Sequence, residues 1–180
     1  MFRIAVTGPE STGKSLLAKQ LADHYHTFYV PEIAREYLDK LGRKYVFEDI
    51  ALIAREQFAL ENIIAAKAKG YLFCDTGFIV TKIWSHYKYG KCDPWIEEMA
   101  ITHRYDLYLL CNIDLPWEDD PLREHPNNRN ELFEIYYKEL VNLKADFRII
   151  SGKGESRLKN AILAVEETFG IGHKVVIDCH

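Results

Sequence analysis

The sequence predicts an α/β protein of three layers, in which helices cover both faces of a five-stranded, mainly parallel sheet. Short apolar runs alternate along the chain with longer segments of helical periodicity, which is typical of parallel strands joined by crossover helices. The 180 residues fit one domain with a sizeable core, and no repeat, linker or low-complexity tract divides them. We therefore expect residues 1–180 to form a single domain.

The first part of the chain follows this alternation closely. Phe2 to Val6 is a short apolar run that predicts the first strand, and apolar residues then recur at helical spacing from Leu16 to Tyr25. Residues 27–30 predict a second strand. Pro31 suits the first turn of the next helix, and the longest helical pattern then runs from Phe47 to Lys69.

The middle of the chain repeats the same order of elements. Tyr71 to Cys74 predicts the third strand, which ends at Asp75. Helical patterns then cover residues 78–89 and 94–103. The apolar run 107–111 predicts the fourth strand.

A polar segment interrupts the alternation between Asp114 and Arg129. It reads DLPWEDDPLREHPNNR and is too long and too charged for a tight connection, so it predicts a lid over about residues 114–129. A helix at 131–143, a fifth strand at 147–150 and a last helix at 157–169 follow. The final residues, GHKVVIDCH, predict a short edge strand.

Composition argues against several classes of protein. Lys and Arg number 23 against 27 Asp and Glu, so the net charge of −4 provides no broad field for nucleic acid. No run of about 18 apolar residues predicts a membrane span, and the start of the chain lacks a signal-peptide core. The four cysteines form no C-x-x-C pair and are expected to be reduced thiols. We therefore expect a cytoplasmic protein without nucleic-acid or membrane partners.

Residues 8–15 read GPESTGKS, which matches the phosphate-binding loop, or P-loop, pattern G-x-x-x-x-G-K-S between a predicted strand and a predicted helix. Backbone N–H groups of such a loop surround phosphate, Lys14 reaches the β- and γ-phosphates, and the Ser15 hydroxyl binds Mg²⁺. The sequence thus predicts a P-loop NTPase fold that uses ATP and Mg²⁺. The residues assigned to ATP are Gly8, Pro9, Glu10, Ser11, Thr12, Gly13, Lys14, Ser15, Leu16 and Arg129.

Two absent patterns narrow the type of P-loop protein. No N-K-x-D guanine-reading motif exists, which favours ATP over GTP. The third strand ends in Cys74-Asp75-Thr76-Gly77 rather than in two acids, which argues against a motor ATPase. The remaining class is a small phosphotransferase of the nucleoside or nucleotide kinase type.

Such an enzyme needs carboxylates beside an acceptor pocket and cations that stabilise the transferred charge. Glu32 and Asp75 each follow a predicted strand, so both are expected at the carboxyl edge of the sheet. We assign Asp75 chiefly to Mg²⁺ with Ser15, and either carboxylate can serve as the base. Lys14 and the lid residue Arg123 complete the predicted catalytic set.

The acceptor is expected to be a small molecule held by polar and aromatic side chains. The residues assigned to it are Glu32, Arg35, Tyr37, Asp75, Trp84, Tyr87 and Trp117. Each of these also has an ordinary structural alternative, such as a solvated ion pair, a helix cap or core packing. The sequence leaves homo-oligomer formation open.

Five segments together carry a family resemblance: GPESTGKS, VPEIAREYL, FCDTGFIVTKIW, YDLYLL and DLPWEDDPLRE. In this order they resemble the ribosylnicotinamide kinase domain of the bacterial NadR proteins, from Ile4 to about Phe169. The chain departs from some members at Pro31, where they carry an aromatic residue, and at Gly77, where they carry an acid. We expect neither the adenylyltransferase nor the DNA-binding domain of larger NadR proteins here.

The resemblance implies transfer of the ATP γ-phosphate to the 5′-hydroxyl of nicotinamide riboside, which yields nicotinamide mononucleotide for NAD salvage. It also implies that Asp75 lies beside Mg²⁺ and the 5′-hydroxyl, that Glu32 and Arg35 face the riboside, and that Arg123 belongs to the closing lid. Two alternatives stay open: a kinase for another nucleoside or nucleoside monophosphate, and a non-catalytic module that binds ATP or GTP and signals through a partner.

Overall fold

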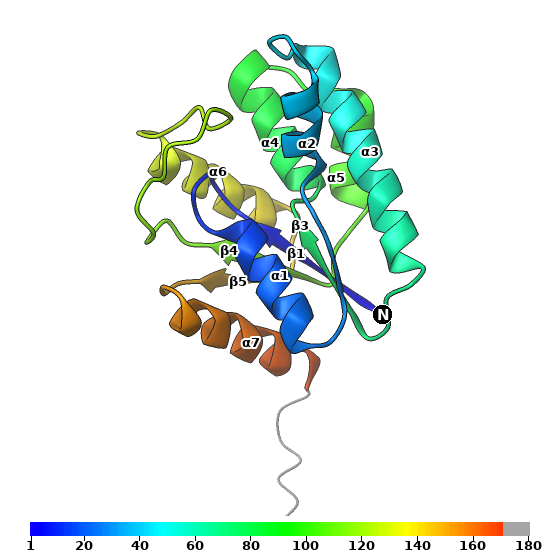
Figure 1. The fold of residues 1–180 in the computed structure, drawn as a ribbon, viewed down its shortest axis with the longest axis vertical. Coiled ribbons are helices and arrows are strands. Elements are labelled where there is room, and N and C mark those ends of the chain that lie inside the picture. Colours follow the sequence, from blue (N-terminus) through cyan, green and yellow to red (C-terminus); the bar gives the residue numbers. More distant parts are fainter. Residues whose placement is uncertain (171–180) are drawn as a thin grey trace, which may run out of the picture.

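The structure is a computed structural model that describes residues 1–170, and it has the predicted three layers (Figure 1). Its five strands form one sheet in the order β2-β3-β1-β4-β5, and every pairing is parallel. Every residue of β3 and β4 is buried, as expected for strands covered on both faces. The strands are β1 (Phe2–Thr7), β2 (Phe28–Val30), β3 (Tyr71–Asp75), β4 (Leu107–Cys111) and β5 (Phe147–Ile150).

The helices divide between the two faces of the sheet. One face is covered by α1 (Lys14–His24) and α7 (Glu155–Phe169), and the other by α3 (Phe47–Ala65), α4 (Phe78–Tyr89) and α6 (Arg129–Asn142). Of the two remaining helices, both in the upper half of Figure 1, α2 (Ile33–Lys40) packs on α3 and α5 (Pro94–Thr102) packs on α4. This arrangement leaves the carboxyl edge of the sheet open between α1, α2 and α4.

Alternation along the central strand produces two separate apolar layers. Successive side chains of a strand point to opposite faces, so Ile4 and Val6 pack on the α1–α7 side while Ala5 faces the other helices. Leu17 and Leu21 of α1 lie one turn apart and contact the first layer. The short apolar runs and the helical spacing of the sequence therefore match the layers that they were expected to form.

Several expected boundaries are wrong by a few residues, including those at Pro31, Lys69 and Arg129. Pro31 does not begin a helix, because Gln57 of α3 holds the turn before α2: its Oε1 accepts the Ile33 N–H at 2.8 Å and its Nε2 donates to the Pro31 carbonyl at 3.1 Å. The helix predicted to reach Lys69 ends at Ala65, after which the chain turns into β3. Arg129 begins α6 instead of lying in the loop.

The edge strand expected over residues 172–180 falls outside the described residues. Within residues 1–170, no helix combines the length and apolar character that crossing a bilayer requires.

Candidate active site

The P-loop connects β1 to α1 at the carboxyl edge of the sheet. Three of its residues have positive φ: Gly8 at 132°, Ser11 at 55° and Gly13 at 75°. A Cβ at Gly8 would lie 2.9 Å from the Cys111 carbonyl oxygen, so only glycine lets β4 approach the loop this closely. The glycines of the motif are thus required by both backbone conformation and packing.

Two side chains of the motif turn back onto the loop itself. Thr12 Oγ1 and Lys14 Nζ each donate to the Pro9 carbonyl at 2.8 Å. Gly13 directly precedes α1, whose N-terminus therefore faces the space enclosed by the loop. Free N–H groups and the positive end of a helix dipole make this space suitable for a phosphate.

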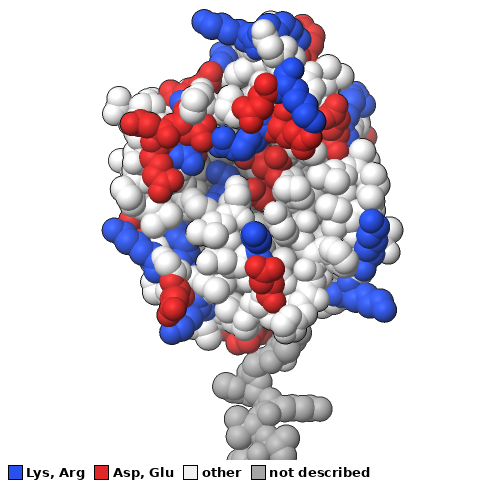
Figure 2. Space-filling view, viewed as in Figure 1, with Lys and Arg blue, Asp and Glu red and all other residues white. Residues whose placement is uncertain are grey.

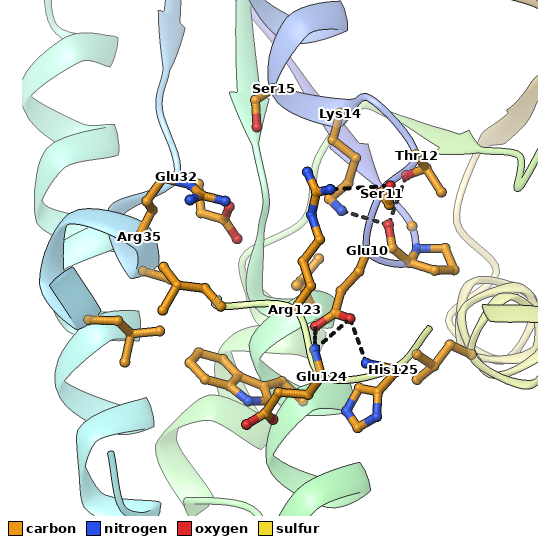
Figure 3. Close-up of a pocket in the computed structure, with 18 of the residues that line it drawn as sticks. Glu10, Ser11, Thr12, Lys14, Ser15, Glu32, Arg35, Arg123, Glu124 and His125 are labelled. Carbon is orange, nitrogen blue, oxygen red and sulfur yellow. Dashed lines mark hydrogen bonds between the residues drawn. The ribbon is translucent and has the colours of Figure 1, made fainter. Parts of the chain in front are cut away.

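A cavity of about 860 Å³ extends from the P-loop toward α2, α4 and the lid. Figure 2 shows acidic and basic side chains gathered around a hollow in the upper half of the face that it displays. In Figure 3, Lys14 and Ser15 lie on one side of the cavity, Glu32 and Arg35 extend from the opposite side, and Arg123 lies between them. The cavity thus brings two sets of polar groups together from different elements.

Asp75 is the last residue of β3, which pairs with β1 directly below the P-loop. The residue is 1% exposed, and its Oδ1 has no hydrogen-bond partner. Burial, reinforced by the charge of Glu32, raises the pKa of Asp75 to about 6, while the Ser15 hydroxyl and the charge of Lys14 oppose part of this shift. An unsatisfied carboxylate oxygen beside a serine hydroxyl fits the oxygen ligands that Mg²⁺ prefers.

The backbone bends sharply after Asp75. Thr76 has φ 80°, which is rare for a β-branched residue, and its Oγ1 contacts Glu32 Oε1 at 3.4 Å. At Gly77 an added Cβ would lie 2.8 Å from the Tyr105 ring. Tyr105 therefore explains why no acidic side chain fits at Gly77 in this chain.

The segment predicted to form a lid lies against the P-loop. It comprises residues 114–128, because Arg129 belongs to α6. The Glu10 carboxylate accepts the backbone N–H groups of Glu124 at 3.1 Å and His125 at 3.0 Å (Figure 3). Ser11 Oγ accepts the Glu118 N–H at 2.9 Å and also contacts Arg123 Nη1 at 3.3 Å. The lid is thus joined to the loop that would surround the phosphates.

The same segment also contacts the opposite wall of the cavity. Asp120 pairs with Arg35 of α2 at 2.8 Å. Glu124 accepts from Lys88 Nζ at 2.5 Å and from the Tyr45 hydroxyl at 2.8 Å. The lid therefore bridges the P-loop and the wall formed by α2 and α4.

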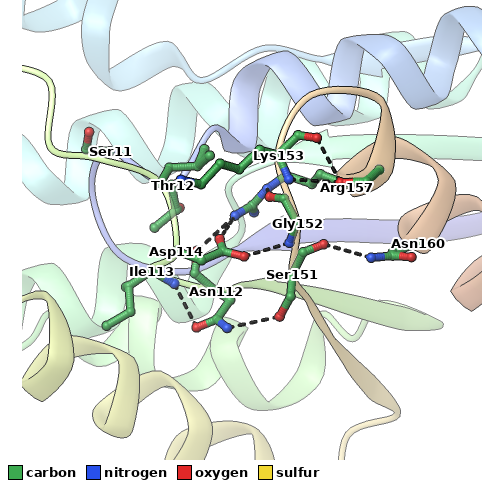
Figure 4. Close-up of polar contacts among 12 residues, drawn as sticks. Ser11, Thr12, Asn112, Ile113, Asp114, Ser151, Gly152, Lys153, Arg157 and Asn160 are labelled. Carbon is green, nitrogen blue, oxygen red and sulfur yellow. Dashed lines mark hydrogen bonds and ion pairs between the residues drawn. The ribbon is translucent and has the colours of Figure 1, made fainter.

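The start of the lid is fixed by the polar network of Figure 4. The Asp114 carboxylate pairs with the buried Arg157 guanidinium and accepts the Gly152 N–H at 2.6 Å. Arg157 also donates to the carbonyls of Asn112 at 3.1 Å and Gly152 at 2.9 Å, while Asn112 Nδ2 donates to Ser151 Oγ at 2.9 Å. The end of β4 is therefore tied to the loop before α7.

Residues 3–157 match the sequence model of a family described as the AAA domain. This chain belongs to the AAA domain family. The match covers the P-loop, both carboxylates, the lid and the Asp114–Arg157 network.

Two curated relatives show a more specific similarity than the match to the AAA domain model does. The chain is 26% identical over 176 residues to the trifunctional NAD biosynthesis/regulator protein NadR of Escherichia coli strain K12, which covers 93% of this chain and 42% of NadR. It is 28% identical over 126 residues to the protein of the same name from Salmonella typhimurium, and this match covers 67% of this chain and 30% of that protein. The chain thus spans less than half the length of the curated relatives that it matches.

Solved structures share the fold of this AAA domain. NadR in complex with NR has a TM-score of 0.79 at 23% identity, with 94% of this chain and 51% of that chain covered. NadR in complex with NAD and AMP-PNP has a TM-score of 0.77 at 23% identity, with 96% of this chain and 51% of that chain covered. Thymidylate kinase from Ehrlichia chaffeensis has a TM-score of 0.64 at 15% identity, with 92% of this chain and 97% of that chain covered.

The AAA domain brings some of the predicted acceptor residues to the cavity and leaves others outside it. Glu32, Arg35, Trp84 and Tyr87 line the cavity, as do all predicted ATP residues from Gly8 to Leu16.

Four predicted residues are not among those that line the cavity, and one of them is Asp75, which is buried at the end of β3. The other three have different environments. The Tyr37 hydroxyl donates to Asp49 at 3.0 Å, and Trp117 Nε1 donates to Asp119 at 2.8 Å; neither aromatic residue lines the cavity. Arg129 donates to the Ser11 carbonyl at 3.2 Å and holds the loop from outside.

Sequence reasoning missed several residues that shape this site. Tyr45 and Lys88 line the cavity, while Asp114 and Arg157 fix the start of the lid. Arg157 offered one signal, because a charged residue occurs at a core position of the last helical pattern. The pairing partners could not be found, because they are far apart in the chain.

Proposed function

We propose that this chain transfers the γ-phosphoryl group of ATP to the 5′-hydroxyl of nicotinamide riboside, which forms nicotinamide mononucleotide. The observation that carries the proposal is one cavity in which a preshaped P-loop faces Glu32 and Arg35 across a space large enough for a nucleoside. The NadR relatives, and the NadR structures in complex with NR and with AMP-PNP, support this choice of acceptor and donor.

On the donor side, the P-loop N–H groups and the N-terminus of α1 bind the phosphates of ATP. Lys14 leaves the Pro9 carbonyl and contacts the β- and γ-phosphates, while Arg123 stabilises the charge of the transferring group from the lid. Ser15 and Asp75 would hold Mg²⁺, which neutralises phosphate charge when it is bound.

On the acceptor side, Glu32 and Arg35 bind the hydroxyl groups of the riboside. Trp84 and Tyr87 supply aromatic surface on the α4 wall for the pyridinium ring. The carboxylate pair Glu32 and Asp75 aligns the 5′-hydroxyl and takes up its proton. Because the lid excludes water from this space, the phosphoryl group passes to the riboside instead of being hydrolysed.

The proposal is tested by measuring ADP formation from ATP and Mg²⁺ with one acceptor at a time. We expect nicotinamide riboside to give the highest kcat/KM in a panel with thymidine, deoxycytidine and nucleoside monophosphates. Asp75→Asn should abolish ADP formation while ATP still binds, which separates a kinase from a module that only binds nucleotide. ADP formation only with the other acceptors would contradict the proposal.

A further inference from the structure

A second cluster of reactive side chains lies where α4 meets α5, and none of its members lines the cavity. His86 is near the end of α4, Cys92 lies in the connecting loop, and Glu97 is in the first turn of α5. One ligand atom from each lies within 4.8 Å of the other two. Within residues 1–170, no other group of His, Cys, Asp and Glu side chains has this proximity.

The backbone that carries these side chains is held in place. Gly90 ends α4 with φ 67°, and the Ser85 hydroxyl donates to the Lys91 carbonyl at 2.8 Å. Asp93 then caps α5 by accepting a backbone N–H at 2.8 Å. Cys92 therefore sits in a short connection fixed at both ends, so its sulfur is presented in a defined position.

One oxygen of the Glu97 carboxylate faces the His86 imidazole, and the other faces Lys82. His86 Nε2 lies 2.5 Å from Glu97 Oε1, and the two side chains are 46% and 35% exposed. Lys82 contacts the other Glu97 oxygen at 3.3 Å, but it also pairs with Glu139 at 2.5 Å. Glu139 thus compensates the ammonium, and an ion can reach His86 and Glu97 from solvent.

We propose that His86, Cys92 and Glu97 bind a Zn²⁺-class transition-metal ion. Imidazole nitrogen, thiolate sulfur and carboxylate oxygen are the three ligand types of tetrahedral zinc sites, and water would complete the coordination. A thiolate ligand selects against Mg²⁺, so this site is chemically distinct from the one beside the P-loop. On binding, the Cys92 thiol proton is released to solvent, and the ion replaces the direct contact between His86 and Glu97.

The bound ion would tie the end of α4 to the start of α5. Because α4 also carries Trp84 and Tyr87, the ion would stabilise one wall of the cavity without touching either substrate. Metal binding at this cluster does not require the proposed kinase activity.

The test uses Co²⁺ as the probe, because a thiolate bound to Co²⁺ gives a charge-transfer absorption that oxygen ligands do not give. We expect the 180-residue protein to show this absorption at one equivalent of Co²⁺ in the presence of excess Mg²⁺. Cys92→Ser should remove it. His86→Asn and Glu97→Gln should weaken Co²⁺ binding by at least about 10-fold, the effect typical of losing even an outer partner of a metal ligand. Circular dichroism verifies that each variant is folded.

Cys111→Ala is the matched control, since Cys111 is a buried cysteine of β4 that does not belong to the cluster. It should leave the absorption unchanged, and Zn²⁺ should displace Co²⁺ from both this control and the unmodified protein. The proposal is wrong if saturating Co²⁺ gives no thiolate absorption, if the absorption persists in folded Cys92→Ser, or if folded Cys111→Ala removes it.

Discussion

Replacing Asp75 with asparagine is expected to stabilise the ligand-free protein at pH 8 while it abolishes phosphoryl transfer. Burial and the neighbouring charge of Glu32 raise the pKa of Asp75 from 3.8 to about 6. This change corresponds to about 3 kcal/mol of unfavourable free energy for the ionised side chain, at 1.36 kcal/mol per tenfold change in proton affinity. Asparagine has nearly the same shape and no charge, so it removes this cost.

The sign of the pH dependence follows from proton binding. Between about pH 4 and pH 6, Asp75 is protonated in the folded protein and ionised in the unfolded chain, so stability from this group decreases as the pH rises. Above about pH 6 the full cost is present. The stability advantage of Asp75→Asn should therefore be about 3 kcal/mol at pH 8 and small near pH 4.

Urea denaturation and thermal melting without nucleotide or Mg²⁺ measure this difference. For a chain of this size, about 3 kcal/mol corresponds to an increase in Tm of roughly 6 to 12 °C. Asp39→Asn is the matched control, because Asp39 is exposed on α2 and should change stability by less than about 0.5 kcal/mol. An Asp75→Asn protein that is less stable than the unmodified protein at pH 8, or a difference independent of pH, would refute the reasoning.

Three further substitutions test separate parts of the site. Lys14→Ala should lower kcat on the order of 10²-fold or more, as steady-state kinetics would show. It should change Tm little, because the ammonium donates to one loop carbonyl, that of Pro9, and serves phosphate charge. Gly77→Ala should destabilise the fold by about 1 to 3 kcal/mol in urea, because the new Cβ meets Tyr105. Asp114→Ala should destabilise it by about 2 to 3 kcal/mol, because the Arg157 guanidinium loses its carboxylate partner.

Each of these three predictions has an outcome that would contradict it. Full turnover by Lys14→Ala would remove the lysine from the mechanism. Unchanged denaturation midpoints for Gly77→Ala would show that the ring moves away freely. Asp146→Ala serves as the control for Asp114→Ala, since the exposed pair of Asp146 with Arg148 is worth at most about 1 kcal/mol. A loss of stability in Asp114→Ala no larger than in this control would contradict the third prediction.

The fold was predictable because its signals are local. The apolar runs of β3 and β4, the helical spacing of α1 and the P-loop motif each lie within a few consecutive residues, and the structure places them as expected. The error at Pro31 has a non-local cause. Gln57, which lies in another helix, supplies the hydrogen bonds that hold this turn outside α2.

The candidate site was predictable only in part, for the same reason. Glu32 and Asp75 could be placed at one edge because parallel strands align their carboxyl ends. No such rule places the aromatic residues, and Tyr37 turned toward Asp49 instead of the cavity. Several contacts of the lid join residues more than 80 positions apart, such as Arg35 and Asp120, and no local pattern shows them.

The most direct measurement is identification of the phosphorylated product by ³¹P NMR after incubation with ATP, Mg²⁺ and nicotinamide riboside. We predict a phosphomonoester at the 5′ position of the riboside in equal amount to the ADP formed. Inorganic phosphate as the sole product alongside ADP would contradict it, because the cavity would then be delivering the phosphoryl group to water.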